Sequence, residues 1–95
     1  MSSPVRDAKG DLGSTLRRVA VFFRLGQVGA GSEALARGID LLAELLADPK
    51  AAELAPRLLP HLQAALDAQA RADHLYVADL LEYELLPAIE GRVDP

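Results

Sequence analysis

Three polar residues lie on the apolar side of the long C-terminal helix that the sequence predicts over residues 60–86. If this segment is one helix, Gln69, Asp73 and Glu84 share a side with the apolar residues Leu62, Leu66, Tyr76, Val77 and Leu80. A carboxylate on the core side of a helix costs free energy unless it is paired or hydrogen-bonded. We therefore predict that all three are buried polar residues, which pair with an arginine, cap a neighbouring helix or accept a hydrogen bond from a tyrosine.

The alternative chemistry for these carboxylates is a metal site or an acid–base pair. Asp73 and Glu84 are eleven residues apart, or about 16 Å along a helix, so they could meet only across a symmetry axis. Carboxylate-bridged metal bundles also use a Glu-x-x-His pair, and here Arg71 stands three residues before His74. The alternative of a small carboxylate metal-binding protein would use Asp73, Asp79, Glu82 and Glu84. We expect no metal, no cofactor and no catalytic residue.

Composition and motifs restrict the remaining chemistry. The chain of 95 residues has no cysteine, which excludes disulfides, thiolate catalysis and cysteine metal ligands. His61 and His74 fall on different sides of the predicted helix and are expected at its rim. The glycine-rich run at residues 26–31 follows a helix and lacks a Lys-Ser or Lys-Thr pair, so it does not predict a phosphate loop. We expect a protein that is not an enzyme.

The net charge of −4 argues against nucleic acid as a partner, because phosphate binding needs a clustered basic face. Arg17, Arg18 and Arg24 form the only local excess of positive charge, and nucleic-acid binding through them is the weakest alternative. The chain has no run of about 18 apolar residues, which is the length that a membrane-spanning helix needs. The N-terminus lacks the pattern of a secretory signal. We expect a cytoplasmic protein with no nucleic-acid or membrane partner.

The spacing of apolar residues predicts an all-α fold. Hydrophobic residues make up 51% of the chain and aromatic residues only 4%, so the apolar content is mainly leucine and alanine, which favour helices over sheets. We predict one domain over residues 14–91, a small antiparallel bundle of three to four helices with a long C-terminal helix. Residues 1–13 are small and polar and are predicted to be a flexible tail.

The predicted helices span residues 14–27, 33–47, 49–59 and 60–86. Ser32 is expected to cap the second helix and Asp48 the third, which would bend near Pro56. Gly91 is expected to close the ordered part. The three glycines between residues 26 and 31 indicate a turn, although they would also allow the first two helices to be continuous.

The last predicted helix carries more apolar surface than so short a chain is expected to cover. Its two tyrosines are seven residues apart and therefore share a side, and tyrosine suits an interface because its hydroxyl group needs a polar partner. The predicted interface consists of Leu75, Tyr76, Leu80, Tyr83, Leu86 and Ile89. In the alternative, the first two helices wrap both sides of the last helix within one chain.

The layout of a loose N-terminus, an antiparallel bundle and a long late helix resembles the small helical bacterial chaperones of the flagellar export type, over residues 14–90. The composition, rich in Ala, Leu and Arg, is typical of a bacterial protein. The resemblance implies, as an alternative, an export or assembly chaperone that binds a client helix. The residues themselves predict a non-enzymatic interaction or adaptor protein, a homodimer through its last helix.

Overall fold

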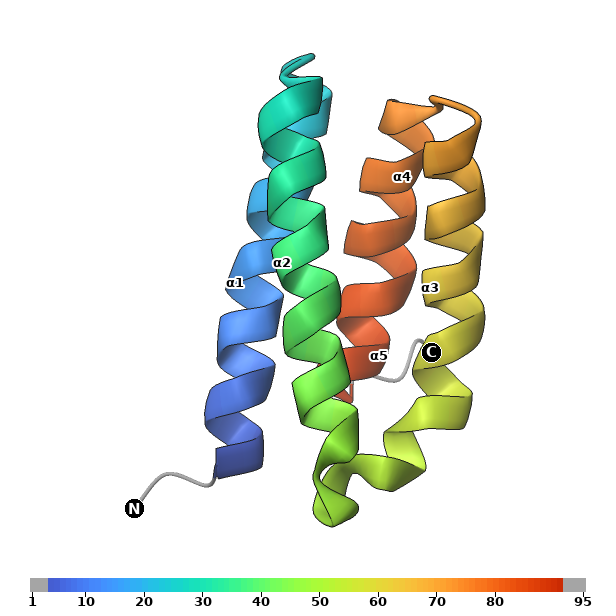
Figure 1. Cartoon of the computed structure of the whole chain (residues 1–95). Helices are drawn as coiled ribbons and strands as arrows, with labels where there is room; N and C mark the ends of the chain where they lie inside the picture. Colours follow the sequence, from blue (N-terminus) through green and yellow to red (C-terminus); the bar gives the residue numbers. More distant parts are fainter. Residues whose placement is uncertain (1–3, 92–95) are drawn as a thin grey trace.

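The computed structural model describes residues 4–91, and every regular element in that range is a helix. The elements are α1 (Pro4–Arg24), α2 (Val28–Ala47), the 3₁₀ helix η1 (Pro49–Leu54), α3 (Ala55–Ala70), α4 (His74–Leu80), the π-helical η2 (Leu81–Leu85) and α5 (Leu86–Glu90). The last three are contiguous and form one rod over residues 74–90. Neighbouring helices alternate in direction, which makes an up-and-down bundle (Figure 1). The predicted all-α bundle is confirmed.

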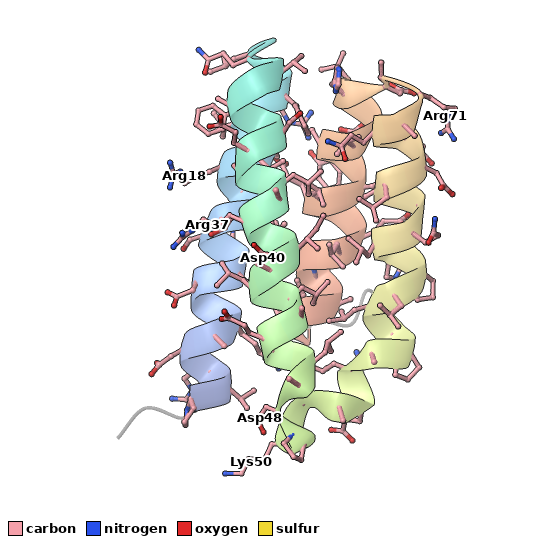
Figure 2. The ribbon with its side chains drawn as sticks, in the orientation of Figure 1. Arg18, Arg37, Asp40, Asp48, Lys50 and Arg71 are labelled. Atoms are coloured by element: carbon pink, nitrogen blue, oxygen red, sulfur yellow. The ribbon has the colours of Figure 1, made fainter. Side chains whose placement is uncertain are left out.

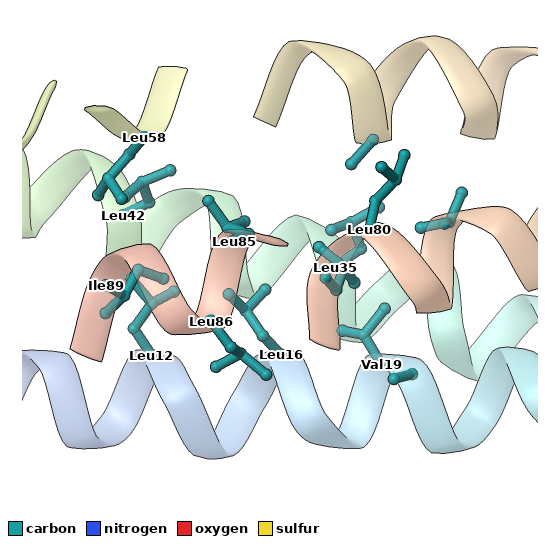
Figure 3. Close-up of a cluster of buried hydrophobic side chains, with 14 of the residues drawn as sticks. Leu12, Leu16, Val19, Leu35, Leu42, Leu58, Leu80, Leu85, Leu86 and Ile89 are labelled. Carbon is teal, nitrogen blue, oxygen red and sulfur yellow. The ribbon is translucent and has the colours of Figure 1, made fainter. Parts of the chain in front are cut away.

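The core lies between two helical hairpins and is built almost entirely from leucine and other aliphatic side chains. Figure 3 shows α1 facing the last rod, with leucines of α2 and α3 closing the other sides. The labelled core residues are Leu12, Leu16, Val19, Leu35, Leu42, Leu58, Leu80, Leu85, Leu86 and Ile89. Complete burial of one such side chain contributes about 1.5–3 kcal/mol, so this cluster is the main source of stability.

The first hairpin consists of two separate helices, joined by a turn at residues 25–27. Gly26 adopts a φ of +76°, a left-handed conformation that glycine reaches at little cost. The predicted cap at Ser32 is wrong, because α2 begins at Val28. Gly31 is helical, and a β-carbon there would overlap the ring of Phe23. This glycine therefore serves close packing of α2 against α1.

The N-terminal segment differs from the predicted tail. α1 begins at Pro4, so residues 4–13 are helical, and Leu12 is fully buried. Proline suits the first position of a helix. A glycine inside a helix costs only about 1 kcal/mol, less than the burial of Leu12 returns, so tertiary packing outweighs local propensity. Residues 1–3 of the predicted tail lie outside the described residues.

The predicted long helix over residues 60–86 is wrong, because the chain reverses direction after α3. The turn is a Schellman motif: the Asp73 amide donates to the Ala68 carbonyl and the Ala72 amide to the Gln69 carbonyl, both at 2.9 Å. Ala72 occupies the left-handed position, φ +59°, where glycine is usual. The last rod therefore begins at His74 and not at Pro60. Residues 4–13 are helical, so the loose N-terminus behind the chaperone resemblance is not found in that segment.

The last rod contains one wide turn, η2, just before Pro87. Proline cannot donate to the carbonyl four residues earlier, that of Tyr83, and its ring collides with that carbonyl in a regular α-helix. In the wide turn the Leu86 amide instead donates to the Leu81 carbonyl. The rod therefore continues to Glu90, and Gly91 follows with a φ of +73°, as expected for a helix C-terminus.

Candidate interaction surface

The three polar residues predicted to be buried lie mainly on the surface. Glu84 is exposed, with its Oε2 atom 3.1 Å from His61 Nδ1 on α3. Asp73 is exposed and caps α4, accepting a hydrogen bond from the Tyr76 amide. Gln69 is half-buried near the end of α3. The predicted burial is wrong for Asp73 and Glu84 because the turn at residues 71–73 starts a new helix, so one helical wheel cannot describe both halves. The predicted capping role is confirmed for Asp73, which caps α4.

The carboxylates of the alternative metal site are engaged elsewhere. Asp79 and Glu82 pair with Arg24. Glu84 pairs with His61. Within residues 4–91, no three His, Asp or Glu side chains gather as metal ligands do.

The predicted interface on the last helix divides into a buried half and an exposed half. Leu80, Leu86 and Ile89 lie in the core of the single chain, so the prediction is wrong for these three. They are covered because α1 and α3 both pack against the last rod. Leu75, Tyr76 and Tyr83 remain exposed.

Tyr83 points directly away from the bundle. Its neighbour Glu82 reaches toward α1, and Glu84 on the other side reaches toward α3. Leu81 and Leu85 point into the core. Tyr83 lies between two residues that reach toward opposite neighbours, and Leu81 and Leu85, two positions before and after it, are buried, so its side chain faces solvent. The Tyr83 side chain is accordingly 67% exposed.

Beside Tyr83 runs a shallow groove of about 400 Å³ between α1 and the last rod. It is lined by Arg17, Val21, Glu82, Tyr83 and Leu86. Val21 is 52% exposed although it is apolar. Val21 was not predicted as an interface residue. It lies four residues after Arg17 and three before Arg24 and so shares their side of α1.

Ion pairs stand at both ends of this groove. Arg17 Nη2 lies 2.9 Å from Glu90 Oε1 at one end. At the other end Arg24 Nη2 lies 3.0 Å from Asp79 Oδ1 and 3.4 Å from Glu82 Oε2. The hydrogen bonds from Arg24 to Glu82 and Asp79 raise the pKa of its guanidinium group above its ordinary value, so it stays charged. Exposed pairs of this kind each contribute about 0–1 kcal/mol to folding.

We call this surface the α1–α4 face and define it by seven residues. They are Arg17, Val21, Arg24, Asp79, Glu82, Tyr83 and Glu90. Its charges are segregated by helix: both arginines lie on α1 and the three acids lie on the last rod. Two apolar side chains lie between the pairs.

A second exposed apolar cluster lies at the end of the bundle where both hairpins turn. Leu25 lies in the first turn, Val28 is the first residue of α2, and Leu75 is the second residue of α4. A hollow of about 430 Å³ lies between the two turns, and His74 lines it. The His74 ring packs on Phe23, with 5.0 Å between ring centroids. Among residues 4–91, the ion pairs near this cluster are those that Arg24 makes with Asp79 and Glu82.

The outer side of α2 is a charged surface of a different kind. Figure 2 shows Arg37 and Asp40 extending from α2 into solvent, with Arg18 of α1 nearby. The Arg18 guanidinium lies over the Phe22 ring at 5.9 Å from its centroid. Phe22 is half-buried beneath this guanidinium group, whereas the neighbouring Phe23 is buried in the core.

Comparisons with protein-family models, curated proteins and solved structures found no match to this chain. Within residues 4–91, no helix combines the length and the apolar character needed to cross a membrane. Function is therefore inferred from the surface of the bundle itself.

Proposed function

We propose that the protein is a non-enzymatic interaction protein that self-associates through the outward side of its last helix. The observation that carries this proposal is the outward orientation of Tyr83, which lies beside exposed Val21 in a groove bordered by ion pairs. Tyrosine and arginine are enriched in protein interfaces and dominate their binding energy. A bacterial cytoplasmic setting, expected from composition, belongs to the same proposal.

The mechanism is the burial of a small apolar centre within a charged rim. Covering Tyr83 and Val21 removes apolar area from water, which stabilises a complex by about 25 cal/mol for each Å². The arginines and acids around them set orientation more than affinity. The exposed area is small, so we expect an association in the micromolar range, at the weak end of specific complexes.

Sedimentation velocity over tens to hundreds of micromolar protein tests this function. The natural chain should form a dimer, and Tyr83→Glu should be a monomer because it places a carboxylate in the apolar centre. Leu59→Glu is the matched control, since Leu59 on α3 is also exposed, at 48%, and the added charge is equal. Circular dichroism should show equal helicity in all three proteins.

If the natural chain is a monomer at every concentration, the proposal of self-association is wrong. Dimers that tolerate Tyr83→Glu but not Leu59→Glu would move the interface to α3. The second candidate function is a chaperone that binds a client helix, and it is supported by the same open groove. A monomeric natural chain would leave this second function as the proposal.

A further inference from the structure

We infer that the occupant of the α1–α4 face is a second copy of this chain, related by a two-fold axis that runs parallel to the helices. In this arrangement each α1 lies against the last rod of the other copy. The inference rests on the proposed function, because it requires that the chain self-associates. It adds which of the possible dimers is formed.

The charges of the α1–α4 face are segregated between its two sides. α1 contributes only cations, Arg17 and Arg24, while the last rod contributes only acids. A surface whose two halves have opposite signs is complementary to itself after a suitable rotation. Symmetric dimers use the same patch on both copies, so self-complementarity is the property they require.

The two antiparallel helices have a defined register. Arg17 is level with Glu90, and Arg24 is level with Asp79 and Glu82, as their ion pairs demonstrate. Val21 lies midway between the two arginines on α1, and it lines the groove with Tyr83. Oppositely charged groups therefore occupy the same height on both sides of the groove.

Two face-to-face rotations are available to such a surface. An axis across the helices places α1 on α1 and the last rod on the last rod, so arginines face arginines and acids face acids. An axis along the helices keeps every residue at its own height and exchanges the two sides. Arg17 then faces Glu90 of the second copy, and Arg24 faces its Asp79 and Glu82. Like charges in contact are strongly disfavoured, so the parallel axis is selected.

The parallel arrangement also fills the groove. Val21 of one copy meets Tyr83 of the other on each side of the axis, and each arginine lies between an acid of its own chain and an acid of the second copy. A bidentate guanidinium has enough donors to serve both acceptors. The ion pairs seen in the single chain therefore hold the arginines in the position that the second copy uses.

A distance between spin labels tests this arrangement, because the chain has no cysteine and Asp7→Cys introduces a single labelling site. Asp7 is exposed on α1, outside the face. It is 14 residues from Val21, about 21 Å along the helix. The parallel axis brings both labels to the same end, below about 25 Å. The crossed axis places them at opposite ends, about 42 Å apart.

Disulfide capture provides the second measurement and uses positions on the face itself. A mixture of Val21→Cys and Tyr83→Cys chains should form a mixed disulfide under mild oxidation much faster than either variant alone crosslinks to itself. Leu59→Cys should not crosslink with either. Faster self-crosslinking of Val21→Cys would support the crossed axis.

The outcomes separate the inference from the proposed function. A short label distance and a mixed disulfide support both. A distance near 42 Å, or self-crosslinking, overturns the parallel axis and leaves self-association in place. No dipolar coupling at hundreds of micromolar protein overturns self-association, and the inference with it. A dimer with crosslinks only to Leu59→Cys places the interface on α3 and overturns the inference.

Discussion

The α1–α4 face and the outer side of α2 carry similar numbers of charged residues, but they arrange them differently. On α2 both signs lie on a single helix, with Arg37 placed between Glu33 and Asp40. Within residues 4–91 the exposed Arg37 and Asp40 form no ion pair. On the α1–α4 face the signs are divided between two helices and enclose Tyr83 and Val21. Charge by itself therefore does not mark an interface; its arrangement around exposed apolar groups does.

The largest difference in the free energy of unfolding is expected between substitutions on the inner side and on the outer side of the last rod. Leu85 is buried, and Leu85→Ala should lower the free energy of unfolding by about 2–5 kcal/mol, through lost burial and the cavity left behind. Tyr83→Ala, two residues away but outside the core, should change it by no more than about 0.5 kcal/mol. Urea denaturation of monomeric protein measures both, and equal losses would mean that Tyr83 belongs to the core.

Two glycines of α2, one packed against α1 and one open to solvent, allow a similar comparison of stability. Gly31→Ala should cost about 1–3 kcal/mol, because the new β-carbon overlaps the Phe23 ring. Gly29→Ala meets nothing within 4 Å and should be neutral or stabilising by up to about 1 kcal/mol. Thermal unfolding followed by circular dichroism compares them. If Gly31→Ala is harmless, the first hairpin packs less closely than described.

Charge reversal should affect the two faces unequally. Arg24→Glu places a third carboxylate beside Asp79 and Glu82 and should weaken the dimer about 10- to 100-fold, or about 1.4–2.8 kcal/mol. Arg37→Glu makes the same change of charge on α2 and should leave the dimerisation constant unaltered. Sedimentation equilibrium gives both constants, with helicity checked for each variant. If both variants weakened the dimer equally, the cause would be the change in net charge and not the position of the arginine.

The smallest effect concerns the turn that places α4 beside α1. Ala72→Gly should stabilise the fold by about 0.5–1 kcal/mol, because glycine reaches the positive φ without strain. The matched control is Ala64→Gly in the interior of α3, which should destabilise the fold by a similar or larger amount. Chemical denaturation distinguishes them by sign. A loss of stability at both positions would mean that alanine adopts the positive φ at residue 72 with little strain.

The sequence was sufficient for the fold class and for the boundaries that residue type marks clearly. The end of α2 at Ala47 and the Asp48 cap were predicted from aspartate and proline. The last helix was predicted to end at residue 86, and it continues through Pro87 to Glu90. The turn at Ala72 could not be predicted, because no glycine or proline marks it and alanine favours a helix.

That one missed turn explains most errors about the site. Treating residues 60–86 as one helix placed Asp73 and Glu84 on the core side. Tyr83 was recognised from its residue type, whereas its neighbour Val21 became visible only when α1 and the last rod were placed side by side. Pairings such as Arg24 with Asp79 join residues far apart in the chain, and spacing along one helix contains no signal for them.

The most direct test of the central claim is the concentration dependence of backbone amide chemical shifts, measured by NMR from tens of micromolar to about one millimolar. Self-association through the α1–α4 face predicts progressive shifts at Val21, Arg24 and Tyr83, with Arg37 and Asp40 on α2 unchanged. Shifts confined to α2, or spectra that do not change with concentration, would contradict it.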